Sequence, residues 1–204
     1  INFPSEKDRM YRVLGRIRRF QREHGSRQVQ GRWAYAKRLN TELGKKIARE
    51  IVFYASENRA DVIVFEYLEM KGKLSGKKKQ KLQMWRKRDI QKRCGQQAHR
   101  KGIRISRICA WNTSRLAFDG SGKIDRDIQD HRLCTFQNGK RYNCDLSASY
   151  NIGARYFIRE ILKPLPATER SLLEAKVPAV KRRTSCVYAD LRDLISEMEL
   201  RKAA

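Results

Sequence analysis

The chain has 204 residues, of which 40% are hydrophobic, so it is long enough to bury a core as one domain with an insert and a tail. Its formal net charge of +25 favours nucleic acid as a partner, because each neutralised phosphate releases a condensed counterion; a ribosome-associated or membrane-surface protein is the alternative. No stretch reaches the ~20 apolar residues of a membrane span. Five scattered cysteines without a CxxC pair argue against a disulfide framework and favour a reducing cytosol.

The chain begins with a pattern typical of two helices. A basic segment over about Ser5–His24 carries apolar residues at helical spacing, and Gly25-Ser26 ends it. A second helix is predicted over about Gly31–Asn58, and its expected buried stripe consists of Ala36, Leu39, Leu43, Ile47, Ile51 and Tyr54. The short break between them predicts an antiparallel helical hairpin over about residues 5–58.

The hydrophobic period then changes. Four consecutive apolar residues within Asp61–Glu66 predict a strand buried on both faces. A loop rich in Gly, Ser and Lys over Lys71–Lys79 and a third helix over Leu82–Arg100 follow. Ile103–Ile108 alternates apolar and basic residues, which predicts a strand with one covered face.

The remaining sequence predicts an irregular region followed by helices. Residues 111–140 are rich in Gly, Asp and Asn, with a hairpin expected at Asn138-Gly139. Asp145 is predicted to cap a fourth helix, with Ile152, Tyr156 and Phe157 on one side, and the tail from residue 167 is predominantly helical. Alternating helices and strands predict an α/β fold.

Two carboxylates are candidates for a metal site. Glu66 stands at the carboxyl end of an apolar strand, where α/β proteins place their sites, and Asp145 stands at the start of a helix. Converging carboxylates bind Mg²⁺ or Mn²⁺, and such ions can activate water for phosphodiester cleavage. Taken alone, Glu66 is more simply an exposed glutamate at the end of a strand, and Asp145 is more simply an ordinary helix cap.

Two segments carry a family resemblance. VFEYL at 64–68 resembles the second RuvC motif of the TnpB family, the nucleases of IS200/IS605-type transposons related to Cas12, and NCDLSASYNI at 143–152 resembles the third. AHRKGI at 98–103 and NTS at 112–114 resemble the stretch that leads into the family's zinc-binding insert. The resemblance covers about residues 8–157.

This resemblance implies an RNase H-like (RuvC) core and RNA-guided, metal-dependent DNA cleavage. Glu66 and Asp145 would be two of three carboxylates that hold Mg²⁺ or Mn²⁺, guide RNA and DNA would be the partners, and the protein would be cytoplasmic and associated with the bacterial nucleoid. The family's first aspartate normally lies upstream of the point where this chain starts, and Asp8 is a poor substitute. The expectation is therefore a C-terminal portion that lacks the first strands of its core and is inactive as a fragment.

The expected insert departs from the family pattern. The family usually has two CxxC pairs there, a strong zinc signature, whereas the matching positions of this chain hold Ala117 and Gly120, then Cys134 and Gln137. One thiolate cannot hold structural zinc, so the prediction is a degenerate zinc knuckle without zinc. A turn over residues 119–122 is expected in its place.

The resulting predictions are a partial RuvC core at 1–108 and 141–162, the degenerate insert at 109–140 and a helical tail at 163–204. Two functions stay open: part of an RNA-guided DNA endonuclease, or a nuclease-dead nucleic-acid-binding protein derived from the same family. The residues predicted to bind nucleic acid are Arg18, Arg19, Lys77, Lys78, Lys79, Arg86, Arg88, Arg93, Arg100 and Arg104.

The excess of positive charge generates the first testable prediction. The chain should bind RNA and single-stranded DNA tightly and with little sequence specificity, and its affinity should fall steeply with salt. For single strands the expected slope of log K against log salt is about −0.7 per phosphate neutralised. Fluorescence anisotropy over a salt series measures this slope. An affinity that does not change between low and physiological ionic strength would contradict the prediction.

Overall fold

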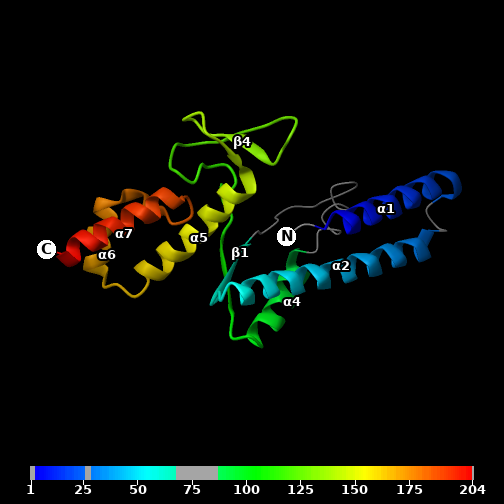
Figure 1. Ribbon diagram of the computed structural model, residues 1–204, viewed down its shortest axis with the longest axis horizontal. Coiled ribbons are helices and arrows are strands. Elements are labelled where there is room, and N and C mark those ends of the chain that lie inside the picture. Colours follow the sequence, from blue (N-terminus) through cyan, green and yellow to red (C-terminus); the bar gives the residue numbers. More distant parts are fainter. Residues whose placement is uncertain (1–2, 26–28, 68–86, 204) are drawn as a thin grey trace. The chain divides into compact units, whose positions relative to one another are not determined.

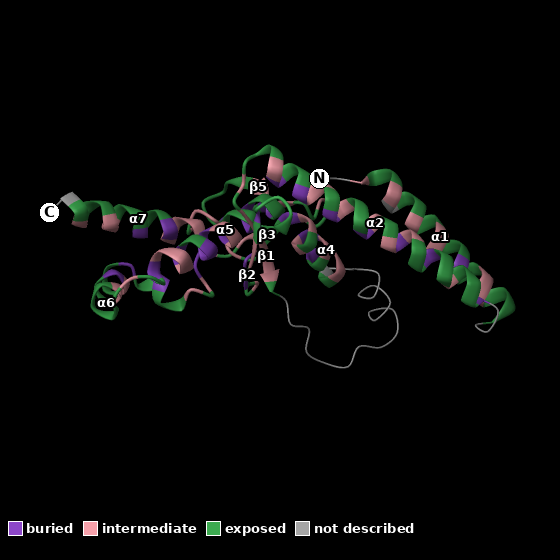
Figure 2. Ribbon diagram, turned by 90° about the horizontal axis from the view of Figure 1, so that it is seen from below, coloured by how far each residue is buried: buried purple, intermediate pink, exposed green. Residues whose placement is uncertain are grey.

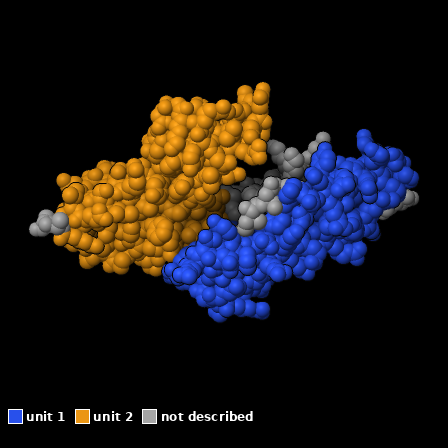
Figure 3. Space-filling view, in the orientation of Figure 1, with its two compact units in different colours: residues 1–63, 70–105 blue, residues 64–69, 106–204 orange. Residues whose placement is uncertain are grey.

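The protein is described by a computed structural model over residues 3–25, 29–67 and 87–203. Its contacts divide the chain into two compact units, one made of residues 1–63 and 70–105 and the other of residues 64–69 and 106–204 (Figure 3). Within the described residues, no helix combines the length and the apolar character needed to cross a lipid bilayer. The division into RuvC core, insert and tail follows a family pattern rather than contacts, so it stays a prediction.

Unit 1 is built on the predicted helical hairpin. Helices α1 (Pro4–His24) and α2 (Gln30–Glu57) lie side by side (Figures 1 and 2). The end of α1 lies against the start of α2, where the Arg32 guanidinium is 4.0 Å from the centroid of the Phe20 ring, and the start of α1 lies against the second half of α2, where Lys46 forms an ion pair with Glu6. These contacts confirm the antiparallel hairpin and both helices to within a residue or two of the predicted ends.

The buried face of α2 differs from the predicted stripe. Leu39, Leu43, Ile47 and Ile51 are half-buried and Tyr54 is exposed. Ala36 is buried as predicted, and the other buried positions lie one residue further on and are mostly small: Asn40, Gly44, Ala48, Val52 and Ala55. Small side chains let the neighbouring helices α1 and α4 approach α2 closely, so the larger residues flank the contact instead of filling it.

Helix α4 (Lys87–His99) packs on this small-residue face. Cys94 is fully buried there, and its thiol donates to the Ala48 carbonyl oxygen at 3.7 Å. Burial raises the pKa of the Cys94 thiol to about 11. The third predicted helix is thus confirmed from Lys87 onwards, whereas residues 82–86 and the predicted loop over 71–79 lie outside the described residues.

Strands β1 (Val62–Tyr67) and β2 (Arg104–Cys109) form a two-stranded sheet. The Arg104 N–H donates to the Asp61 carbonyl oxygen at 2.8 Å, so the two strands start side by side. Both predicted strands are confirmed. The expectation that the first would be buried on both faces is wrong, because Val62–Glu66 are only half-buried and, within the described residues, β2 is its only paired strand.

The region predicted to be irregular contains a small antiparallel sheet in unit 2. Its strands are β3 (Asp125–Arg126), β4 (Leu133–Thr135) and β5 (Arg141–Asn143), in the order β3-β4-β5. The predicted hairpin at residues 138–139 is confirmed: it joins β4 to β5, with Gly139 at a φ of 81°. Strands this short give too few alternating residues to stand out in the sequence.

Helix α5 (Cys144–Leu162) follows β5 directly. Asn143 caps it, since its side chain accepts hydrogen bonds from the N–H groups of Asp145 and Leu146, so the prediction that Asp145 is the cap is wrong. The buried apolar face also differs from the prediction. It contains Ala154, Ile158 and Leu162. Of the predicted residues, Tyr156 is buried, Ile152 is half-buried and Phe157 is exposed.

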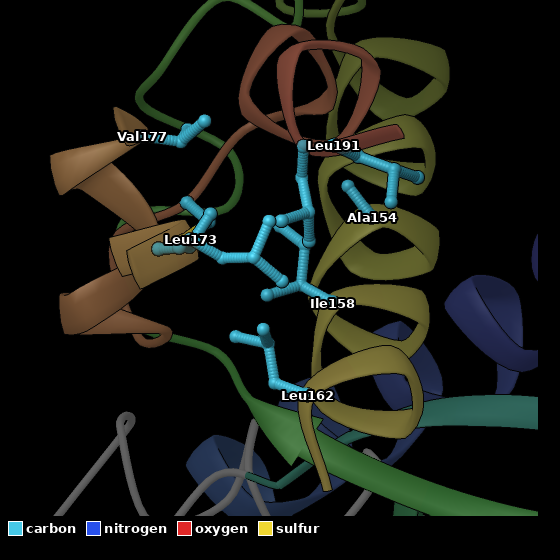
Figure 4. Packing of buried hydrophobic residues seen from close by; sticks show 9 residues of the cluster. Ala154, Ile158, Leu162, Leu173, Val177 and Leu191 are labelled. Atoms are coloured by element: carbon cyan, nitrogen blue, oxygen red, sulfur yellow. The ribbon is translucent and has the colours of Figure 1, made fainter. Parts of the chain in front are cut away.

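The predicted helical tail is confirmed and covers this face of α5. It comprises α6 (Ala167–Lys176), the short 3₁₀ helix η2 (Pro178–Arg182) and α7 (Tyr188–Ala203). Ile158 and Leu162 of α5 pack against Leu173 of α6 and Leu191 of α7 (Figure 4). This cluster is the main apolar core of unit 2.

Two adjacent leucines of α6 test how much this core contributes. Leu173 is 0% exposed and Leu172 is 56% exposed. Leu173→Ala should therefore lower the free energy of unfolding by about 2–5 kcal/mol, through lost burial and a cavity. Leu172→Ala, the matched control, should change it by less than about 0.5 kcal/mol. Denaturant unfolding followed by circular dichroism measures both changes in free energy. Equal changes in the two variants would show that Leu173 does not pack into this core.

Candidate functional site

Glu66 lies near the carboxyl end of β1, as predicted, and is half-buried. The buried Thr113 hydroxyl lies 2.5 Å from Glu66 Oε1 and donates to it. The same hydroxyl is 3.2 Å from the Ala110 carbonyl oxygen. A residue fixed in the loop after β2 thereby orients the Glu66 carboxylate.

That loop is held by a row of polar side chains on α5, at positions 151, 155 and 159, which we call the polar stripe. Arg155 Nη1 donates to the carbonyl oxygens of Cys109 at 2.9 Å and Trp111 at 2.7 Å. Asn151 Nδ2 donates to those of Thr113 at 3.0 Å and Leu116 at 2.9 Å. The stripe therefore fixes the main chain on both sides of the Thr113 hydroxyl.

The other end of the polar stripe holds strand β2. Arg159 Nη1 donates to the Arg107 carbonyl oxygen at 3.0 Å, and Arg159 Nη2 donates to Ser106 Oγ at 2.6 Å. Residues four apart on a helix lie on one face, so one side of α5 runs along the chain from β2 into the loop. The same face reaches the tail, because Asn151 Oδ1 accepts from the Tyr188 N–H at 3.2 Å.

Arg155 brings a buried positive charge to this region. It is 2% exposed, its Nε donates to the Cys186 carbonyl oxygen, and its Nη2 is buried without a hydrogen-bond partner among the described residues. Burial lowers the pKa of the Arg155 guanidinium, and neighbouring acidic groups, Glu66 among them, oppose that shift. The Glu66 carboxylate therefore feels a fixed cation in a partly desolvated place.

Asp145 lies in the first turn of α5 and is exposed. Its N–H donates to Asn143 Oδ1 at 2.9 Å, and its carboxylate has no hydrogen bond or ion pair among the described residues. Glu66 and Asp145 belong to the same compact unit. Their convergence on one ion stays a prediction, since no group of three His, Cys, Asp or Glu side chains suited to a metal occurs in the described part of the chain.

The insert is packed as an apolar cluster. Ala117, Cys134, Phe136 and Cys144 are buried together. Among these four residues, Cys134 and Cys144 are the two that could bind zinc, and a structural zinc site needs four ligands. The donor set of this cluster does not fit a tetrahedral zinc site.

Of the other two positions that match the knuckle, Gly120 lies in a turn and Gln137 lies against it. The Ser121 N–H donates to Asp119 Oδ1 at 3.0 Å, which confirms the predicted turn over residues 119–122. Gly122 has a φ of 114°, and a Cβ there would lie 2.6 Å from the side-chain oxygen of Gln137. The Gln137 side chain thus lies directly against the turn.

Contacts between aromatic rings pack this insert against α5. The Phe118 ring lies 5.6 Å from that of Phe136, 5.1 Å from that of Tyr142 and 4.9 Å from that of Tyr150, measured between ring centroids. Contacts at such distances add stability beyond the buried area. The turn, the β3-β4-β5 sheet and α5 are therefore joined by packing.

The basic residues predicted to bind nucleic acid have different surroundings. Arg93 is half-buried and pairs with Asp89, with 3.0 Å between Nε and Oδ2. Lys77, Lys78, Lys79 and Arg86 lie outside the described residues. The exposed members are Arg18 and Arg19 on α1, Arg88 on α4, Arg100, and Arg104 on β2. A role in binding stays a prediction for all ten.

Three residues of this site escaped the sequence interpretation: Thr113, Asn151 and Arg155. Thr113 and Asn151 were included only as parts of motifs. The available signal was a polar residue every fourth position on a helix face that also buries apolar residues. Such residues need partners when buried, but their spacing does not say which partners.

The apolar packing of the insert generates a prediction about zinc. Purified protein should contain no stoichiometric zinc, and a chelator should leave its unfolding temperature unchanged, because the two thiols of this cluster are half of the four ligands that structural zinc needs. Elemental analysis and thermal unfolding with and without EDTA measure the two quantities. One zinc per chain, or a chelator-induced loss of the insert's near-ultraviolet aromatic signal, would overturn this account of residues 109–144.

No known protein family and no curated protein matches the chain by sequence. Its fold is similar to that of a chain in the cryo-EM structure of the Cas12f1–sgRNA–target DNA complex, with a TM-score of 0.53 and 19% sequence identity. The similarity covers 70% of this chain and 40% of that chain, so this protein matches less than half the length of its structural relative. At this identity the likeness establishes the fold alone: a mixed α/β structure that resembles part of Cas12f1.

Proposed function

We propose that the chain is part of a transposon-type, RNA-guided DNA endonuclease of the TnpB and Cas12f kind, in which Glu66 and Asp145 hold Mg²⁺ or Mn²⁺. The observation that carries the proposal is the placement of Glu66. It lies at the carboxyl end of β1, oriented by the Thr113 hydroxyl, within a fold that resembles part of Cas12f1. The net charge of +25 fits guide RNA and DNA as partners.

The chemistry of the two side chains supports a hard divalent cation. Carboxylate oxygens are the ligands that Mg²⁺ and Mn²⁺ prefer, and a ligand already hydrogen-bonded by a neighbour is oriented before the ion arrives. When bound, the ions would neutralise phosphate charge and supply an activated water. Glu66 is held in this way by Thr113. Asp145 is exposed in the first turn of α5, where the helix dipole stabilises its negative charge.

The exposed arginines support the proposed partners. Arg18 and Arg19 on α1, and Arg88, Arg100 and Arg104 in and near α4 and β2, are accessible to a phosphate backbone. Arginine binds phosphate through two parallel hydrogen bonds, which helps to position a strand as well as to attract it. These residues would bind guide RNA or DNA independently of the carboxylates.

One observation favours a second candidate, a nuclease-dead nucleic-acid-binding protein derived from the same family. The described residues contain no group of three metal-ligating side chains, whereas the family's site uses three carboxylates. In this alternative the basic surface binds nucleic acid and the carboxylates have no metal to hold. The two candidates therefore differ in metal binding and in cleavage.

Metal binding by the 204-residue chain tests the proposed centre. Mn²⁺ titration followed by electron paramagnetic resonance should detect a weak site, because two carboxylates supply only part of the oxygen ligands that the ion needs and water must supply the rest. Glu66→Gln and Asp145→Asn should each weaken it by about tenfold, or about 1.4 kcal/mol, since each keeps side-chain size and removes a charge. Both variants should bind RNA and DNA like the unaltered protein.

Exposed carboxylates on α7 provide matched controls. Glu199→Gln and Asp193→Asn should leave Mn²⁺ binding unchanged, because both residues are exposed on the tail helix. The chain alone should cleave DNA little or not at all with Mg²⁺ or Mn²⁺. If the substitutions at 66 and 145 change the affinity for Mn²⁺ no more than the controls do, the proposed metal site is refuted and the binding-protein alternative stands. Robust cleavage would reveal a further metal ligand within the chain.

A further inference from the structure

The side chain of Asn151 on α5 is fully buried, and its amide joins the loop after β2 to the first residue of α7. Its Nδ2 donates to the carbonyl oxygens of Thr113 at 3.0 Å and Leu116 at 2.9 Å, and its Oδ1 accepts from the Tyr188 N–H at 3.2 Å. We propose that Asn151 is a positioning residue of the proposed metal centre, which acts through the Thr113 hydroxyl to set the orientation of Glu66. The inference deepens the proposed function, on which it rests for its biological meaning.

The partners of the Asn151 amide allow it only one orientation. An asparagine side chain has two N–H donors and one acceptor oxygen, and here two carbonyl oxygens face the Nδ2 group while an N–H faces the oxygen. If the amide were turned over, its oxygen would face two carbonyl oxygens and its NH₂ group would face an N–H. Because buried polar groups without partners are costly, this set of partners fixes both the side chain and the loop.

The bond from Asn151 fixes the main chain of Thr113, and the main chain in turn directs the Thr113 side chain. Thr113 is buried, its carbonyl oxygen accepts from Asn151, and its N–H donates to the Ala110 carbonyl oxygen at 3.4 Å. A β-branched side chain has few χ1 rotamers for a given main-chain conformation. Because both main-chain groups of Thr113 are held, its hydroxyl has little freedom of direction.

The Thr113 hydroxyl has one proton and two acceptors within reach. Its oxygen lies 2.5 Å from Glu66 Oε1 and 3.2 Å from the Ala110 carbonyl oxygen. A short hydrogen bond to an ionised carboxylate is the stronger of the two, so the proton is donated to Glu66. A shift of the loop that lengthened this bond would favour donation to Ala110 and release the Glu66 carboxylate. Asn151 opposes that shift, since it holds the carbonyl of the same threonine.

The position of Asn151 on α5 gives this contact a further consequence. Asp145 precedes Asn151 by six residues on the same helix, which is a separation of about 9 Å along the helix axis. One rigid element therefore carries one of the two proposed ligands and holds the residue that orients the other. Loss of a residue that supports a metal ligand typically lowers metal affinity by about 10–100-fold.

The first test needs no metal, because it follows the Glu66 side chain itself. In ¹³C-labelled protein, the Glu66 carboxyl signal is identified by its absence from Glu66→Gln. Thr113→Val removes the hydroxyl and keeps side-chain size, so it should displace this signal, and Asn151→Ala should displace it in the same direction. Ser147→Ala is the matched control, since Ser147 lies four residues before Asn151 on α5, is buried, and has a hydroxyl without a hydrogen-bond partner among the described residues. An Asn151→Ala signal that stays in place, as the control signal should, would overturn the inference.

Mn²⁺ affinity, measured by electron paramagnetic resonance, separates positioning from general support of the fold. Thr113→Val and Asn151→Ala should each weaken binding by about tenfold, whereas Thr113→Ser, which keeps the hydroxyl, should retain most of the affinity. The double variant should bind no more weakly than Asn151→Ala alone, because both changes act through one hydroxyl. Losses that multiply in the double variant would show that Asn151 does not act through Thr113 and would refute the inference.

A measurement on the unaltered protein decides the question if Asn151→Ala does not fold. Because linkage is reciprocal, saturating Mg²⁺ should slow hydrogen exchange of the Tyr188 N–H by up to about tenfold. The Gly139 N–H, which donates to the Phe136 carbonyl oxygen in the insert, should exchange at an unchanged rate. Equal responses of the two amides would overturn the inference. Absence of Mn²⁺ binding by the unaltered protein would refute the nuclease centre, whereas the carboxyl signal tests the role of Asn151 independently of it.

Discussion

The arrangement of unit 2 depends on the hydrogen bonds of the buried Arg155 guanidinium. It donates to the carbonyl oxygens of Cys109, Trp111 and Cys186, and so ties β2, the following loop and the segment between η2 and α7 to one helix. A loop buried against a helix normally leaves main-chain carbonyls without partners, at a cost of about 1–3 kcal/mol each. The polar stripe on α5 satisfies these groups, which allows an irregular segment to be held as firmly as a strand.

The insert shows a second way of fixing irregular chain. This chain packs small and aromatic side chains around Phe118 and closes the turn with Asp119. A metal centre imposes its geometry through a few strong bonds, whereas this cluster relies on many weak contacts. Its stability therefore follows apolar burial and ring packing.

Much of the architecture is predictable because helices α1, α2 and α5 and strands β1 and β2 carry regular hydrophobic periods. The errors arise where local pattern and tertiary contact disagree. On α2 the small residues are buried and the leucines flank them, because closeness of approach decides the buried face. At α5 the cap is Asn143 rather than its neighbour Asp145. For the site, the sequence supplies Glu66 at a strand end, but its bond to Thr113 spans 47 residues, and no local spacing encodes that contact.

The cysteines differ sharply in accessibility, and this has a practical consequence. Cys109 is exposed, whereas Cys94, Cys134, Cys144 and Cys186 are buried. Burial raises the pKa of Cys94 and Cys134 to about 11 and that of Cys186 to about 12, so those three thiols are almost fully protonated at neutral pH and react slowly. A maleimide dye or spin label added to the unaltered protein would therefore attach at Cys109, two residues before Trp111. The native sequence thus already provides an attachment point for a spectroscopic label at the candidate site.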